Sequence, residues 1–135
     1  MNNYNYFEPF NYTFMNNDYK NNLYGAYEGY LKGNMFKDLY EQYKNYNVAV
    51  IKPKNEQEQD LLNLNQIMFA MHDLNLYLDV YPNDLEKLNM FTKYKDMYND
   101  ISTNYEQKYG PISVNYTNNR TPFEWESTIF PWEVK

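Results

Sequence analysis

Two stretches of the chain carry apolar side chains at spacings of three and four residues, and each stretch predicts a long helix. The first stretch runs from about Asn55 to Val80. At about 100° per residue, one row of its apolar side chains falls on a single face, with Leu61 and Met68 at the edge. The members of this row are Leu64, Ile67, Met71, Leu74 and Leu78. We expect this face to form the core.

The same helix carries a second apolar row on the roughly opposite face. This row consists of Leu62, Phe69, Leu76 and Val80. The two rows explain why leucines alternate with polar residues in the segment DLNLYLDVYPND, residues 73–84. Such alternation is typical of a strand, but here successive leucines belong to different faces of one helix.

A second helix is predicted to begin just after Pro82, which ends the first one. We expect its N-terminal cap to lie within Tyr81–Asn83. A single and mostly aromatic stripe follows, made of Phe91, Tyr94, Tyr98, Ile101, Tyr105 and Tyr109. Gly110 stands where a C-terminal glycine cap belongs, and Pro111 prevents continuation. The sequence therefore predicts an all-α fold centred on an antiparallel two-helix hairpin.

One stripe on the second helix can cover only one of the two rows on the first. The second row then needs a different partner, because an exposed apolar row usually marks a binding site or an association liability. Four partners remain open: the aromatic N-terminal tail, the C-terminal segment, a second copy of the chain, or a different protein. The second row is therefore a candidate interface.

Irregular, aromatic arms flank the predicted hairpin. Residues 1–22 are rich in Asn and Tyr and have neither a helical nor a strand period. Residues 23–54 are punctuated by Gly25, Gly29 and Gly33, and a short helix is expected at Met35–Lys44. Residues 55–135 hold the hairpin and an aromatic C-terminal arm.

Four aromatic side chains of the C-terminal arm complete the candidate interface. They are Phe123, Trp125, Phe130 and Trp132. Bulky aromatic side chains dominate both cores and interfaces. These residues therefore either pack on the hairpin of the same chain or anchor the chain to a partner.

The composition excludes several classes of protein. The chain has no cysteine, which removes disulfides, thiolate catalysis and Cys-based zinc sites. A net charge of −6, with scattered Lys and Arg, argues against binding nucleic acid through its phosphates. No apolar run approaches the roughly 20 residues that span a bilayer. The first residues lack the pattern of a secretory signal, so we expect synthesis and retention in the cytosol.

Candidate catalytic and metal-binding groups are few. His72 and Asp73 are adjacent on the predicted helix, so they point about 100° apart and do not form an acid–base pair. A di-metal carboxylate site in a helical bundle uses Glu-x-x-His on two helices, whereas Phe69 stands three residues before the single histidine. We therefore expect no catalytic, cofactor or metal site. The 17 tyrosines could be joined by oxidation, although packing is the favoured explanation of their number.

Three motifs occur in order along the second half of the chain: DLNLYLDVYPNDLEKLNMFTKY, YEQKYGP and a terminal PWE. With them, the chain from about Glu56 to Lys135 resembles the CotJB family of endospore coat proteins. The matching residues are Asp73, Leu74, Asn75, Leu76, Tyr77, Leu78, Asp79, Pro82, Asp84, Tyr109, Gly110, Pro111, Trp125, Pro131 and Trp132. The family often ends in a repeated Pro-Trp, whereas this chain has Phe130-Pro131-Trp132.

A second and less close resemblance concerns Tyr27–Tyr43, which is similar to the small CotJA coat protein. The Gly-Thr-x-Phe element of that protein appears here as Gly33–Phe36, with Asn34 in place of Thr. The two resemblances together imply a fusion of two coat components.

The resemblance to CotJB implies a structural or assembly role in the spore coat, with no catalytic residues. It implies other coat proteins as partners, synthesis in the mother-cell cytoplasm and deposition in the coat. CotJC, which is similar to manganese catalases, is one implied partner, and an adaptor that docks this enzyme is the alternative function. Self-association stays open, and an independent enzyme has no supporting site.

Overall fold

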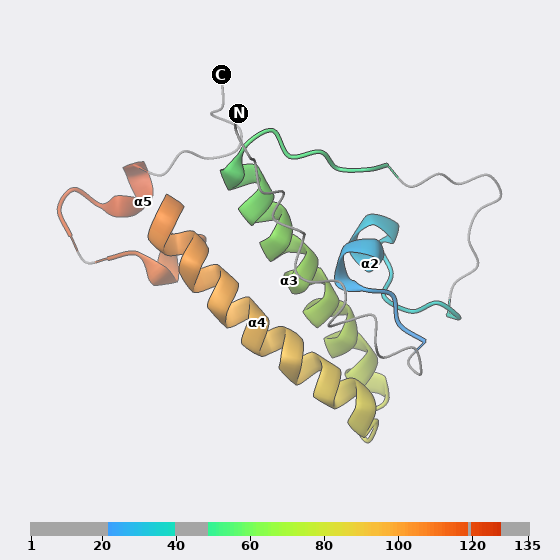
Figure 1. Ribbon diagram of the computed structural model, residues 1–135. Coiled ribbons are helices and arrows are strands. Elements are labelled where there is room, and N and C mark those ends of the chain that lie inside the picture. Colours follow the sequence, from blue (N-terminus) through green and yellow to red (C-terminus); the bar gives the residue numbers. More distant parts are fainter. Residues whose placement is uncertain (1–21, 40–48, 119, 128–135) are drawn as a thin grey trace.

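The computed structural model describes residues 22–39, 49–118 and 120–127, and its regular elements are helices. α3 (Glu56–Val80) and α4 (Leu85–Tyr109) lie side by side and run in opposite directions (Figure 1). α2 (Ala26–Lys32) packs on the other side of α3, so α3 is the central helix. The 3-10 helix η1 (Val114–Tyr116) and the short α5 (Glu124–Ser127) follow α4. The predicted all-α class is confirmed.

α2 lies beside the two long helices, and it corrects the position that the sequence predicts for the short helix. The sequence predicts that helix at Met35–Lys44, but residues 35–39 are not helical, and residues 40–44 lie outside the described part of the chain. α2 ends instead at Gly33, which has a left-handed backbone (φ 69°) that glycine adopts without steric cost. The N–H of Asn34 then donates to the carbonyl of Gly29 at 3.0 Å, which completes the turn.

α3 begins at a polar cap. The side chain of Asn55 accepts a hydrogen bond from the backbone N–H of Glu58 at 2.8 Å, which satisfies one of the free donors of the first turn. The carboxylate of Glu58 reaches back and accepts from the N–H of Lys54 at 2.7 Å. Glu56 and Glu58 also place negative charge at the positive end of the helix dipole. The predicted start and end of this helix agree with the structure to within one residue.

The cap of α4 is Asp84, which corrects the expectation of a cap within Tyr81–Asn83. The Asp84 carboxylate accepts from the N–H of Lys87 at 3.0 Å, and its other oxygen accepts from the phenol of Tyr77 at 3.0 Å. The first bond caps α4, and the second joins the end of α3 to the start of α4. The bond from Lys87, followed by the bond from Tyr77, lowers the pKa of Asp84 below its ordinary value of 3.8.

Replacing Asp84 with Ala should lower the free energy of unfolding by about 1 kcal/mol near pH 7, the usual effect of losing an N-cap. Because the folded-state pKa of Asp84 is depressed, its charge stabilises the fold above pH 3.8, and this contribution is lost as the pH falls below that value. Urea unfolding followed by circular dichroism should therefore show a smaller difference between the two proteins at pH 3 than at pH 7. An Asp84→Asn variant is the matched control, since Asn also caps helices but carries no charge. An equal difference at both pH values would contradict the ionised cap.

A group of polar side chains ties the other end of the α3/α4 pair. The ammonium of Lys108 lies 2.9 Å from an Asp60 carboxylate oxygen and 3.1 Å from a Glu56 carboxylate oxygen. The phenol of Tyr109 donates to the same Asp60 oxygen at 3.0 Å. Partial burial, followed by this hydrogen bond, raises the pKa of Tyr109 to about 12. Both ends of the pair are thus held by side chains as well as by the core.

The core lies on the side of α3 that faces α4, but it extends further round the helix than the first apolar row. Leu64, Ile67 and Leu74 of that row are buried, whereas Met71 and Leu78 are half-buried. Ala70 is fully buried beside them. From α4 the core receives Met90 and Tyr94, and from the segment around α2 it receives Leu23, Ala26, Met35 and Phe36.

Buried polar side chains also belong to the interior of α3. Asn63 and Gln66 are both buried. The side-chain oxygen of Asn63 accepts a hydrogen bond from the side-chain amide of Gln66 at 3.3 Å and another from the side-chain amide of Gln59 at 3.1 Å. Buried amides are tolerated when they are hydrogen-bonded. Apolar and polar residues therefore share the buried surface of this helix.

Candidate functional site

The second apolar row of α3 divides into a covered half and an open half. Leu62 is buried, and Phe69 is half-buried with its ring edge-on to Tyr30 of α2 at 6.1 Å between centroids. Leu76 and Val80, further along the helix, are 51% and 68% exposed. We call Leu76 and Val80 the open row. They lie four residues apart, and such pairs share a helix face.

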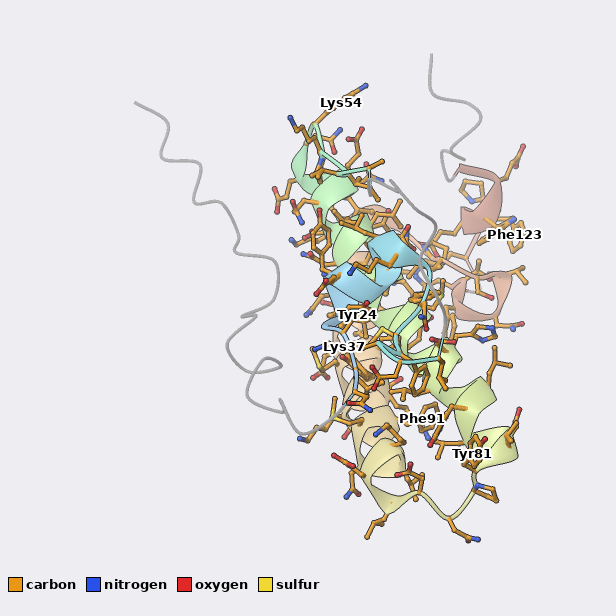
Figure 2. All side chains as sticks on the ribbon, turned by 90° about the vertical axis from the view of Figure 1, so that its right-hand side faces the viewer. Tyr24, Lys37, Lys54, Tyr81, Phe91 and Phe123 are labelled. Atoms are coloured by element: carbon orange, nitrogen blue, oxygen red, sulfur yellow. The ribbon has the colours of Figure 1, made fainter. Side chains whose placement is uncertain are left out.

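The two described aromatic residues of the C-terminal arm, Phe123 and Trp125, lie at the other end of the molecule. Phe123 is exposed, and Trp125 is half-buried on α5, which stands near the C-terminal end of α4 (Figure 1). Phe123 and Tyr81, which marks the turn between α3 and α4, are well separated along the helices (Figure 2). Phe130 and Trp132 lie outside the described residues. The structure therefore does not bring Phe123 to the open row, and the interface role of these eight residues stays a prediction.

A hollow of about 580 Å³ lies on the outer surface of α3. Tyr30 of α2 and Phe91 of α4 stand at its sides, and Met68 and His72 are among the residues of α3 that line it. The described lining residues include no carboxylate that could act with His72. The hollow is apolar and open, which suits contact with another side chain better than acid–base chemistry.

The face of α3 that contacts the N-terminal segment contains residues that belong to the CotJB-like motif but not to the predicted interface. The Asp73 carboxylate accepts a hydrogen bond from the backbone N–H of Met35 at 2.9 Å. The ring of Tyr77 stacks on Phe36, with 4.8 Å between centroids and 26° between planes. The periodicity gives no sign of this contact, because Asp73 is polar and Tyr77 belongs to neither predicted row.

The described part of the chain holds neither a candidate metal cluster of His, Asp and Glu side chains nor a candidate membrane span. Within residues 22–39, 49–118 and 120–127, no three His, Asp or Glu side chains are grouped so that they could hold a metal ion. No helix in this part of the chain is long and apolar enough to cross a membrane. The surface features that remain are the open row, the hollow and the contact around Asp73.

A family model described as CotJB protein matches residues 58–133, which is more than half of the chain. No curated protein and no solved structure matches the chain. The matched range begins at the third residue of α3 and contains α4, η1 and α5, whereas α2 lies before it. On this match, the chain belongs to the CotJB family.

Proposed function

We propose that this protein is a structural or assembly component of the bacterial endospore coat and that it acts through protein–protein contacts. Membership of the CotJB family implies a role associated with the spore coat. We further propose that the chain is made in the mother-cell cytoplasm and is then deposited in the coat. Its partners are other coat proteins, further copies of itself, or both.

The open row is the observation that supports action through contacts. Leu76 and Val80 are large apolar side chains on one helix face, and most of their surface is exposed. Tyr81 and Leu85, on either side of the turn into α4, are also exposed. Burying apolar surface contributes roughly 25 cal/mol per Å², so covering several such side chains can hold a complex together.

Replacing Leu76 with Glu should weaken assembly and leave the helices intact. The side chain is exposed, so the substitution should change the free energy of unfolding by less than about 0.5 kcal/mol. A charge in the centre of an apolar contact costs several times more, because it must be desolvated. Asn89→Glu is the matched control, since Asn89 is exposed on α4 and the substitution adds the same charge.

The experiment compares the tagged wild-type chain and both variants in a sporulating host that lacks its own copy. Wild type and Asn89→Glu should appear in the coat extract, whereas Leu76→Glu should be reduced at least several-fold. Circular dichroism of the purified variants checks that all three are equally helical. Equal coat incorporation of Leu76→Glu and wild type would contradict the role of the open row, and absence of the wild-type chain from the coat would contradict the proposed function itself.

The alternative that the family resemblance suggests is an adaptor for a manganese-catalase-like enzyme. The number of copies in the assembled complex distinguishes such an adaptor from a structural component of the coat, here called a wall component. A wall component should self-associate as its concentration rises. An adaptor should stay monomeric alone and form a complex of fixed composition with the enzyme. Size-exclusion chromatography with light scattering, with and without the enzyme, distinguishes the two.

A further inference from the structure

We propose that the hollow on α3 is a binding site for Cu(I), a soft monovalent metal ion. Its ligands are the thioether sulfurs of Met68 and Met71 and the imidazole of His72, which together are called the ligand set. None of these residues belongs to the open row, and the inference does not depend on the proposed coat role.

The spacing of the ligand set places it on one face of α3. Met71 and His72 follow Met68 by three and four positions, in the segment MFAMH. Residues at these spacings are neighbours on a helix surface, with about 5–6 Å between their Cβ atoms. All three line the same hollow, and the segment lies in the middle of a 25-residue helix, which fixes its backbone. The three side chains therefore leave the helix close enough to one another to reach a single ion.

The chemistry of the ligand set matches Cu(I) better than a hard or divalent ion. Thioether sulfur is uncharged and polarisable and favours Cu(I), and imidazole also suits copper. Mn²⁺, Mg²⁺ and Ca²⁺ prefer oxygen ligands, and the described lining residues include no carboxylate. The chain has a single histidine, so a Glu-x-x-His pair on two helices cannot form either. Two sulfurs and one nitrogen are thus a set that a soft ion accepts.

The exposure of the ligand set distinguishes it from methionines that fill the core. Met35 and Met90 are buried, whereas Met68 is 45% exposed. Met71 is half-buried, and His72 is exposed. Methionine has three rotatable bonds, so a thioether at the surface can turn towards an ion while the helix stays in place. Packing in the core therefore does not account for the position of Met68, and its sulfur is available as a ligand.

Aromatic rings stand at the sides of the hollow. The ring of Tyr30 meets Phe69 edge-on at 6.1 Å between centroids, and Phe91 of α4 is also part of the lining. An apolar surround limits the access of water to a bound metal ion and so influences its redox potential. The other polar lining residues, Asn65 and Asn75, are uncharged, so no positive charge in the described lining repels a cation. The surroundings thus favour a monovalent ion held by neutral ligands.

Calorimetric titration of the full-length chain tests the site. Cu(I) is supplied as its acetonitrile complex in an oxygen-free buffer with ascorbate, and the wild-type chain should give a saturable heat of binding. Met68→Leu, Met71→Leu and His72→Gln should each weaken binding by roughly tenfold or more, because each removes one of three ligands. Met97→Leu is the matched control, since it removes a thioether of α4 that does not line the hollow. Its affinity should equal that of the wild type.

Two results of the titration would overturn the proposal. One is the absence of saturable binding in the wild-type chain. The other is binding in Met68→Leu and Met71→Leu that equals binding in the wild type. Leucine has nearly the volume of methionine, so both variants should keep their helicity by circular dichroism.

Ag(I) provides a second test, which uses the wild-type fold. This ion has the charge of Cu(I) and a similar preference for sulfur, and it stays monovalent in air. In a chain labelled with ¹³C at the methionine methyl groups, in chloride-free buffer, Ag(I) should shift the NMR signals of Met68, Met71 and the His72 ring. The signals of the buried Met35 and Met90 should stay in place. No shift at the ligand set in excess Ag(I), or shifts only at other methionines, would overturn the proposal.

Discussion

Replacing Leu74 with Ala should lower the free energy of unfolding by about 2–5 kcal/mol, the range for buried leucines whose removal leaves a cavity. Leu74 is 0% exposed and belongs to the core that α3 shares with Tyr94 and Met90 of α4 and with Met35. Three segments therefore lose contacts at once. Urea unfolding followed by circular dichroism at 222 nm measures the change.

Leu76→Ala is the control for this experiment, because the two leucines lie only two residues apart on the same helix. Leu76 is mostly exposed, so its truncation should change the free energy of unfolding by less than about 0.5 kcal/mol. Similar losses at Leu74 and Leu76 would mean that the two faces of α3 are assigned wrongly.

Replacing Met35 with Ala should also cost about 2–5 kcal/mol, although Met35 lies outside the α3/α4 pair. Its side chain is 0% exposed and fills the space between α2 and α3 that Gly29 leaves open. Met68→Ala is the matched control, since Met68 is 45% exposed. Hydrogen exchange at the Tyr24 and Lys37 amides gives a local measurement, because these amides donate the hydrogen bonds that join the two ends of residues 22–37. Unchanged stability in Met35→Ala, with unchanged exchange at both amides, would show that residues 22–37 contribute nothing to the stability of the fold.

The sequence predicts α3 and α4 well because their starts and ends depend on local chemistry. Asn55 and Asp84 supply side-chain caps, and Gly110 ends α4 with a positive φ of 105°. The predicted cap of α4 lies one residue before the observed one. Asn83 and Asp84 are both suitable cap residues, and only the structure shows that Asp84 accepts the hydrogen bond from the N–H of Lys87. The apolar residues of α3 show no single preferred side, in agreement with two rows on one helix.

α2 could not be predicted in the same way. The sequence argues against a helix here because it contains three closely spaced glycines, Gly25, Gly29 and Gly33. Glycine inside a helix costs about 1 kcal/mol relative to alanine. Gly29 is nevertheless helical, because the helix gains the burial of Met35 against it. This is a long-range effect that no local pattern carries.

The contacts of Asp73 and Tyr77 with residues 22–37 were not predicted, for a related reason. Asp73 is polar, and its role depends on the backbone N–H of Met35, which is 38 residues away. Phe69 and Leu76 look equivalent in the sequence, but in the structure Tyr30 meets the ring of Phe69, whereas Leu76 is about half exposed. The sequence correctly indicates that α3 needs more than α4 to cover it, and the position of α2 explains how part of this need is met.

The hydrogen bond between Tyr109 and Asp60 has a consequence at alkaline pH. A pKa of about 12 keeps Tyr109 protonated, and therefore able to donate this bond, at pH values where an ordinary tyrosine has lost its proton. The pKa of Tyr77 is raised in the same direction, by burial and by its bond to Asp84. The phenols that join the two ends of α3 and α4 to carboxylates thus keep their hydrogen bonds as the pH rises through the ordinary range of tyrosine ionisation.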